Sequence, residues 1–204
     1  MHIQYNSRQI PSNKQYTANK EYSDLIYGYL QQQSVLDEKQ GIRYVQKKDM
    51  NYTKIGQMLE LTRQTVSKKI GSLIEQGLLY YDEENKRYIL TELEASLAAL
   101  LPCDTVRILC VNLKERSLSV LVYLIKSYYQ HNCESFEINL DVMKDFVGLN
   151  VDNRGRNNQI MKDILLLLQK LGLVDYRIDR VMDEKTGGYR TKYVIEKVDN
   201  SIQF

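Results

Sequence analysis

The sequence is poor in the residues that most often build catalytic and metal sites. It has two histidines, His2 and His131, and three scattered cysteines, Cys103, Cys110 and Cys133. The cysteines do not have the spacing of a metal site, and no Ser/His/Asp or Cys/His set can be assembled from these positions. A glycine-rich phosphate-binding loop is missing too. We therefore expect no enzyme, no cofactor and no metal, and we interpret the cysteines as free, buried thiols.

The chain also has no apolar run of membrane length and no signal peptide, because its first residues are polar. This predicts a cytoplasmic protein without a membrane partner, and no small-molecule ligand can be identified from the sequence. The formal net charge is only +2, which neither requires nor excludes nucleic acid, so the positions of the cations decide. With 204 residues, 43% of them hydrophobic, the chain can form two small domains with real cores.

The clearest local pattern covers residues 51–91. Apolar residues at helical spacing predict a first helix over 51–60. Thr62 is placed to cap a second helix, and Gly77 ends it. Two strand-like runs with a polar turn between them then predict a hairpin. Helix, tight turn, helix and hairpin make a winged helix-turn-helix. The apolar stripe of the second helix consists of Val66, Ile70, Leu73 and Ile74.

The opposite face of this second helix carries hydrogen-bonding and cationic side chains. Such a face suits the major groove of DNA, where amides, hydroxyls and cations meet base edges and phosphates; a merely solvated helix face is the alternative. Glu60 occupies the inter-helix turn, where glycine is common, and this predicts a slightly different or strained turn. The predicted DNA-contacting residues of this helix are Arg63, Gln64, Thr65, Lys68, Lys69 and Ser72.

The pattern returns later in the chain. QGLLYY at 76–81 matches LGLVDY at 171–176, and RYIL at 87–90 matches KYVI at 192–195. The common order of such matches predicts two winged helix-turn-helix domains in tandem, a mainly helical α+β fold with small β-hairpins. An apolar helix over 91–101, which Pro102 stops, connects them. The expected organisation is a flexible N-terminal arm at 1–19, domain 1 at 20–91, a helical connector at 92–115 and domain 2 at 116–199.

The second domain is not expected to repeat the function of the first. Its presumed recognition helix contains an unbroken apolar run, Ile164–Leu168, which places Leu165 and Leu166 away from the core stripe. Exposed leucines there predict a protein interface, with another part of the chain or with a second copy in a homodimer. Cations and amides at the start of this helix and in the second hairpin suit DNA contact, with a solvated surface as the alternative. These residues are Arg154, Arg156, Asn157, Asn158, Lys162 and Arg190.

The segment LTRQTVSKKIGSLIEQGLL at 61–79 resembles the helix-turn-helix of bacterial winged-helix DNA-binding proteins. The tandem arrangement over about residues 20–198 resembles the replication initiators of plasmids and phages, and this resemblance implies origin binding. Three functions follow as hypotheses: a transcription regulator that binds specific double-stranded DNA, a plasmid or phage replication initiator, and a winged-helix protein-interaction module that does not bind DNA.

Overall fold

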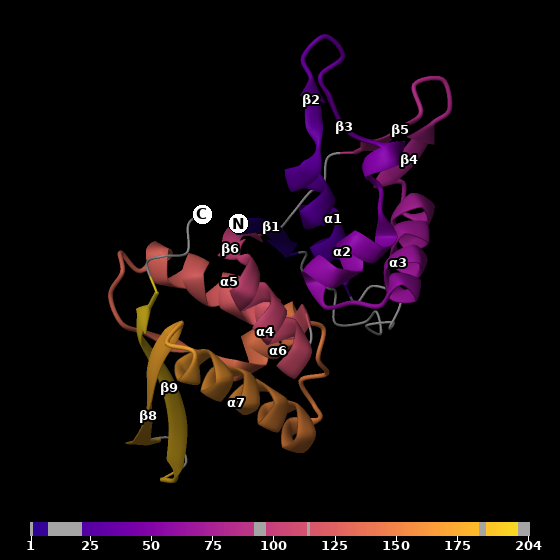
Figure 1. Cartoon of the computed structure of the whole chain (residues 1–204). Coiled ribbons are helices and arrows are strands. Elements are labelled where there is room, and N and C mark those ends of the chain that lie inside the picture. The colour runs from indigo at the N-terminus through magenta and orange to yellow at the C-terminus, as the bar shows by residue number, and fades with distance from the viewer. Residues whose placement is uncertain (1, 8–21, 92–96, 114, 184–186, 200–204) are drawn as a thin grey trace. The chain divides into compact units, whose positions relative to one another are not determined.

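The computed structural model describes residues 2–7, 22–91, 97–113, 115–183 and 187–199. Over these ranges the chain is an α+β protein of helices and small antiparallel sheets (Figure 1). It divides into two compact units, and the boundary falls inside one helix, between Leu118 and Ser119.

A four-stranded sheet and three helices form the centre of the first unit. Its elements are α1 (Ser23–Gln33), β2 (Val35–Asp37), β3 (Ile42–Gln46), a 3-10 turn (Lys47–Asp49), α2 (Tyr52–Leu59), α3 (Arg63–Glu75), β4 (Leu79–Asp82) and β5 (Arg87–Leu90). The strand order is β2-β3-β5-β4, all antiparallel. α1 packs on α3 and β3, and α2 packs on α3. Leu25, Ile70 and Leu79, which come from three different elements, are at most 1% exposed and mark the core.

The second unit repeats this layout with one strand fewer. Its elements are α5 (Glu115–Gln130), whose first turn belongs to the first unit, β7 (Phe136–Ile138), α6 (Leu140–Phe146), α7 (Arg154–Lys170), β8 (Val174–Met182) and β9 (Tyr189–Val198). The strand order is β7-β9-β8. The rings of Tyr123 on α5 and Phe146 on α6 lie 5.3 Å apart, and Leu121 and Ile164 are fully buried.

Both units therefore have the order helix, strand, helix, helix, hairpin. In each, the strand that comes last before the two helices pairs with the last strand of the hairpin: β3 with β5, and β7 with β9. The glycines that end α3 and α7 are also equivalent. Gly77 and Gly172 have φ values of +69° and +68°, and the residue after each donates its N–H to a carbonyl five residues earlier. This is a Schellman end, which favours glycine because an L side chain is strained at positive φ.

Two predictions are wrong for the residues that the structure describes: the flexible N-terminal arm and the helix over 91–101. β1 (His2–Ser7) and β6 (Leu97–Pro102) form an antiparallel pair in the first unit, with His2 opposite Pro102, and α4 (Cys103–Leu113) follows. Residues 92–96 lie outside the described residues. The periodicity of a short apolar run such as 97–101 fits a helix and a strand equally well. Here the run forms a strand because it pairs with β1, which lies almost one hundred residues earlier in the chain.

Candidate nucleic-acid interface

A tight turn joins α2 to α3 and fixes the angle at which α3 leaves the core. Glu60 ends α2 in the left-handed conformation at φ 55°, as expected for a turn position where glycine is common. The Leu61 N–H donates to the Gly56 carbonyl at 2.8 Å. A Cβ at Gly56 would lie 2.4 Å from the Leu61 carbonyl oxygen, so the close approach requires glycine at this position.

The start of α3 is capped as the sequence predicts. The Thr62 hydroxyl accepts the Thr65 backbone N–H at 3.1 Å, and the two threonine hydroxyls lie 2.9 Å apart. Thr65 is half-buried. Its hydroxyl is engaged in the cap, and Thr65 therefore supports the helix end in addition to any contact with DNA.

Three of the six predicted DNA contacts lie on the exposed face of α3 with side chains that are accessible to a ligand. Arg63, Gln64 and Lys68 are exposed, and no other described residue forms a hydrogen bond or ion pair with them. Ser72 is half-buried, and its hydroxyl accepts a hydrogen bond from Gln76 Nε2 at 2.9 Å. Lys69 is only 5% exposed, so its prediction as a DNA contact is wrong. It lies beside Ile70 on the side of the helix that packs into the unit.

The sequence analysis missed two small residues on this face. Ser67 is exposed, and a Cβ at Gly71 would meet no atom within 4 Å. A glycine in the middle of an exposed helix costs about 1 kcal/mol relative to alanine, so a mid-helix glycine without a packing reason was the available signal. Ile74 was assigned to the core stripe but is 43% exposed. The outer face of α3 therefore has small residues between longer polar ones.

The hairpin β4–β5 is held by a buried arginine. Arg87 donates to Asp82 Oδ2 at 3.0 Å, to Asp37 Oδ2 at 3.2 Å and to Gln40 Oε1 at 2.8 Å. Its hydrogen bond lowers the pKa of Asp37, and hydrogen bonds from Asn85 and then Arg87 lower the pKa of Asp82. The arginine thereby ties the β2–β3 turn to the hairpin.

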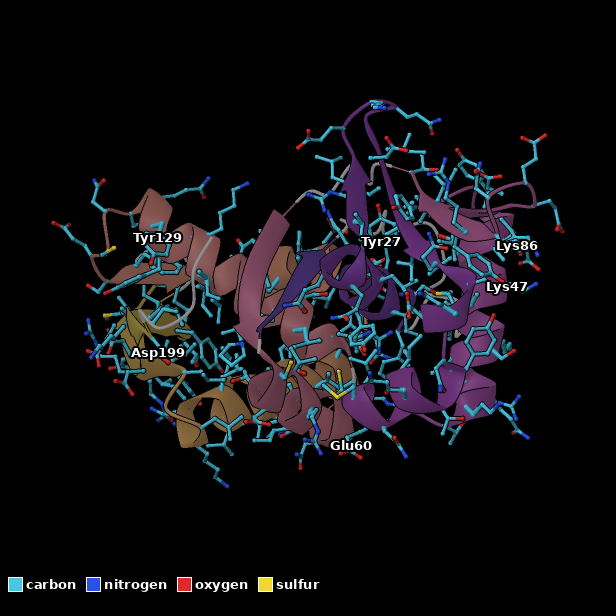
Figure 2. The ribbon with its side chains drawn as sticks, turned by 45° about the horizontal axis from the view of Figure 1, so that its top comes forward. Tyr27, Lys47, Glu60, Lys86, Tyr129 and Asp199 are labelled. Atoms are coloured by element: carbon cyan, nitrogen blue, oxygen red, sulfur yellow. The ribbon has the colours of Figure 1, made fainter. Side chains whose placement is uncertain are left out.

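The tip of this hairpin carries Glu83 and Glu84, both exposed, which makes it a poor partner for phosphates. A basic site lies beside it. The Lys47 N–H donates to the Lys86 carbonyl at 3.0 Å, and the two residues are labelled side by side in Figure 2. The Lys47 ammonium lies 4.9 Å from the centre of the Tyr81 ring.

The amides at the start of α7 have structural partners. Lys144 is fully buried, and its ammonium donates to Asn158 Oδ1 at 2.8 Å and to the Val151 carbonyl at 3.3 Å. It also pairs with Asp141 at 2.6 Å. Asn157 is 7% exposed and donates to the Asn150 carbonyl at 2.7 Å. The prediction that Asn157 reads bases is therefore wrong, and Asn158 is committed to the α6–α7 turn.

The remaining predictions on α7 divide between its two faces. Arg156 and Lys162 are exposed, whereas the side chain of Arg154 lies outside the described residues. Leu166 is 44% exposed, as predicted, whereas Leu165 is fully buried within the chain. The predicted exposure of Leu165 is therefore wrong, and of its two predicted partners only another part of the chain, not a second copy, agrees with this burial. The buried stripe runs through 157, 161, 164, 165 and 168. The apolar pattern predicts a stripe through 160, 164, 167, 168 and 171 instead, which is one position out of phase and shares only 164 and 168 with the structure.

The second hairpin offers fewer free cations than its sequence suggests. Arg177 pairs with Asp179 and Glu196, and Lys192 pairs with Glu137. Arg190 is exposed, and no other described residue forms a hydrogen bond or ion pair with it. It keeps its place among the candidate phosphate contacts.

Comparisons with family models, with curated proteins and with solved structures gave no match for this chain. Within the described ranges, no group of His, Cys, Asp and Glu is arranged to hold a metal ion. Of the three cysteines, Cys103 and Cys110 are buried free thiols as expected, whereas Cys133 is exposed. The helices of the described segments include none with the length and apolar character needed to cross a membrane.

Proposed function

We propose that this chain is a sequence-specific double-stranded-DNA-binding protein with two winged helix-turn-helix units, and that it regulates transcription. The observation that carries the proposal is the outer face of α3. There, Arg63, Gln64 and Lys68 are exposed without partners among the described residues. The polar heads of these side chains do not stabilise the fold by any contact that the structure shows.

The shape of the same face supports close approach to a duplex. Ser67 and Gly71 lie between the longer polar side chains, so the helix backbone can come near the edges of the bases. Arginine pairs with guanine and glutamine with adenine in the major groove, while lysine contacts phosphates or guanine. α3 therefore offers both kinds of contact that a DNA reader needs, those that position the protein and those that specify the sequence.

Site selection from a random duplex pool at near-physiological salt tests the proposal. A defined motif should be recovered, and the double variant Gln64→Ala/Lys68→Ala should bind it at least about tenfold more weakly, since each base contact is worth about 1–3 kcal/mol. The control is Lys39→Ala, an exposed lysine of the β2–β3 turn. Equal weakening by Lys39→Ala, or unchanged binding by the double variant, would exclude α3 as the reader.

Replication initiation is a second candidate, because the topology of the first unit recurs in the second. If both units bind DNA, one chain can occupy two adjacent DNA sites of different sequence. A cluster of repeated sites in the selected DNA would favour initiation, and one palindrome would favour a dimeric transcription regulator. Recovery of no motif, with only weak salt-sensitive binding, would instead favour a protein-interaction module, for which the exposed Leu166 is one available contact.

A further inference from the structure

The strand β8 has one edge that no other strand pairs with among the described residues. The sheet order is β7-β9-β8, so β9 covers only one side of β8. Figure 1 shows the two strands as a long hairpin, in which Tyr176 lies opposite Ile195 and Met182 opposite Tyr189. An unpaired edge presents a row of N–H and C=O groups, which can pair with a further strand.

The hydrogen bonds at the turn of this hairpin determine which backbone groups face the open edge. The Asp183 N–H donates to the Gly188 carbonyl at 2.7 Å, and the register has no bulge between Tyr176 and Met182. In an antiparallel pair, residues that bond the neighbouring strand alternate with residues that do not. The odd-numbered residues of this stretch therefore bond β9, and the even-numbered ones face the open edge. The Gln169 side chain agrees with this assignment, because it donates to the Tyr176 carbonyl from α7 at 3.2 Å.

Apolar side chains lie exposed along the same stretch. Ile178 is 54% exposed and Met182 is 60% exposed, and both lie on one face of the hairpin because they are an even number of residues apart. Tyr189 lies opposite Met182 and is 78% exposed. A strand added at the open edge would cover part of Ile178 and Met182, and the burial of this apolar surface favours the addition.

The charges next to Ile178 suit a second copy of the same strand. Two antiparallel β8 strands with Ile178 opposite its counterpart place Arg177 of one chain opposite Asp179 of the other, on both sides of the twofold axis. Within one chain, Arg177 Nε lies 3.1 Å from Asp179 Oδ2, so four charges of alternating sign meet at the axis. The same register brings Arg180, which has no ion-pair partner among the described residues, to the Tyr176 ring of the second copy.

Other symmetric registers of this strand are less favourable. A twofold axis at Arg177, Asp179 or Arg180 would place that residue opposite the same charge in the second copy, and like charges directly opposite each other are destabilising. An axis at Tyr176 would meet the carbonyl to which the Gln169 side chain already donates. The charges therefore favour the axis at Ile178.

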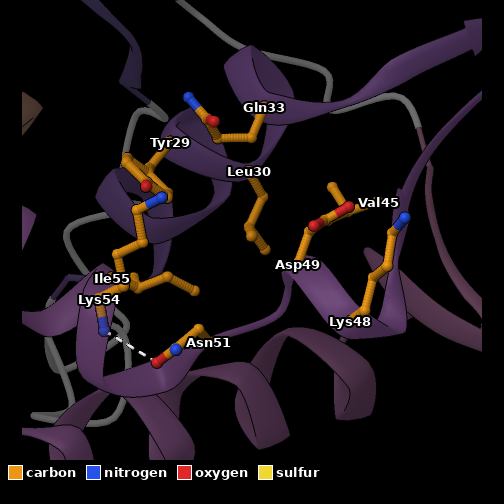
Figure 3. A pocket seen from close by; sticks show the side chains of 9 residues that line it. All are labelled: Tyr29, Leu30, Gln33, Val45, Lys48, Asp49, Asn51, Lys54 and Ile55. Carbon is orange, nitrogen blue, oxygen red and sulfur yellow. Dashed lines mark hydrogen bonds between the residues drawn. The ribbon is translucent and has the colours of Figure 1, made fainter.

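The four-stranded sheet of the first unit has shorter edges. Its outer strands β2 and β4 have three and four residues, compared with nine in β8. The pocket beside β3 offers no matched surface either, because Lys48, Lys54 and Asp49 line it and Figure 3 shows the two lysines on opposite sides of it. Of these surfaces, β8 is the longest edge and the one whose charges complement themselves.

We propose that the chain forms a symmetric homodimer through antiparallel pairing of two β8 strands about a twofold axis at Ile178. The pairing joins two three-stranded sheets into one continuous sheet. One strand pair covers less than the roughly 1,200–2,000 Å² of a stable interface, so the dimer is reversible, with a dissociation constant in the micromolar range. The contact uses neither Leu165 nor Leu166, and it does not depend on DNA binding by α3.

Sedimentation of the full chain over a wide range of micromolar concentrations tests the proposal. The wild type should change from monomer to dimer. Arg177→Asp and Asp179→Arg should each raise the dissociation constant at least about tenfold, because each turns two attractive contacts into repulsive ones. An equimolar mixture of the two variants should dimerise again, since each chain then faces the opposite charge. The control is Arg190→Asp, an equal charge reversal on β9, which should dimerise like the wild type.

Hydrogen exchange in the wild type provides a test that needs no substitution. The Ile178 and Arg180 amides face the open edge, and they should exchange more slowly as the protein concentration rises. The Val181 amide already bonds β9 by the alternation described above, so its exchange should change much less. Equal exchange of the Ile178 amide in dilute and concentrated samples would overturn the proposal.

Three sedimentation results would overturn it as well. The first is a wild type that stays monomeric at all these concentrations. The second is a dimer that both charge variants retain, or that Arg190→Asp weakens as strongly, because the contact would then lie on another surface. The third is a mixture that stays monomeric although Arg177→Asp and Asp179→Arg both keep the wild-type fold.

Discussion

The substitution Gly56→Ala should destabilise the first unit strongly. The new Cβ would lie 2.4 Å from the Leu61 carbonyl oxygen, a backbone atom that cannot rotate away. Forcing an extra carbon into such a site costs about 3 kcal/mol. Moving the turn would also weaken the hydrogen bond from the Leu61 N–H to the Gly56 carbonyl, worth about 1 kcal/mol. Alanine returns about 1 kcal/mol of helix propensity, so the free energy of unfolding should fall by about 3 kcal/mol.

The matched control is the same substitution at Gly71 on α3. A Cβ there meets no atom within 4 Å, so Gly71→Ala should stabilise the unit by about 1 kcal/mol through helix propensity alone. One substitution type should thus give opposite signs at two helical glycines, and the difference isolates the close approach at the turn.

Hydrogen exchange of the α3 amides under native conditions is the direct assay, because it reports the opening of the first unit by itself. For a domain of roughly one hundred residues, 1 kcal/mol shifts Tm by about 4–8 °C, so Gly56→Ala should lower the transition of this unit by more than about 10 °C. A Gly56→Ala variant as stable as the wild type would show that the turn is not as tight as we describe.

Three further predictions concern other parts of the molecule. Gly71→Ala should weaken binding to the selected duplex although it stabilises the fold, because the methyl group would lie between α3 and the DNA; tighter or equal binding in a mobility-shift titration would refute the close approach. The folded-state pKa of Asp37 is lowered, so its contribution to stability is complete above the unfolded pKa of about 4 and is lost as the pH falls through the lower folded value. Urea unfolding between pH 2 and 6 should show a smaller acid loss in Arg87→Met than in the wild type, and an equal loss would contradict this ion pair. Lys144→Met should cost about 1–2 kcal/mol, because the partly buried acceptors of Val151, Asn158 and Asp141 lose a fully buried donor, whereas Lys162→Met on the exposed face should stay within about 0.5 kcal/mol; similar unfolding midpoints for the two variants would contradict a stabilising role of these bonds.

The α3 face shows how far sequence reasoning can reach at a candidate site. The apolar stripe through Val66, Ile70 and Leu73 predicts correctly that Arg63, Gln64 and Lys68, which lie on the other side of the helix, are exposed. It fails for Lys69, because a lysine at the edge of an apolar stripe can bury its aliphatic stem, and only the packing around it decides. Whether the exposed side chains bind DNA stays a prediction.

The α7 helix shows the same limit more sharply. Five consecutive apolar residues, Ile164–Leu168, fit two neighbouring phases of a helix equally well, and the chosen phase placed Leu165 outside. The structure buries Leu165 and turns Asn157 inward, where it bonds the carbonyl of Asn150. An asparagine among core positions cannot be expected from periodicity, because its partner is a backbone group of the preceding turn.

The sequence alone determined the features that depend on neighbours within a few residues. The Thr62 cap, the glycine ends at Gly77 and Gly172, and the repeated order of helices and strands follow from local hydrogen bonding and backbone conformation. The tertiary structure decided what depends on distant partners: the pairing of β6 with β1, the phase of α7, and the burial of Lys144 among the acceptors of the α6–α7 turn. Packing and long-range pairing choose among local options that are nearly equal in energy, and for that reason the local pattern cannot resolve them.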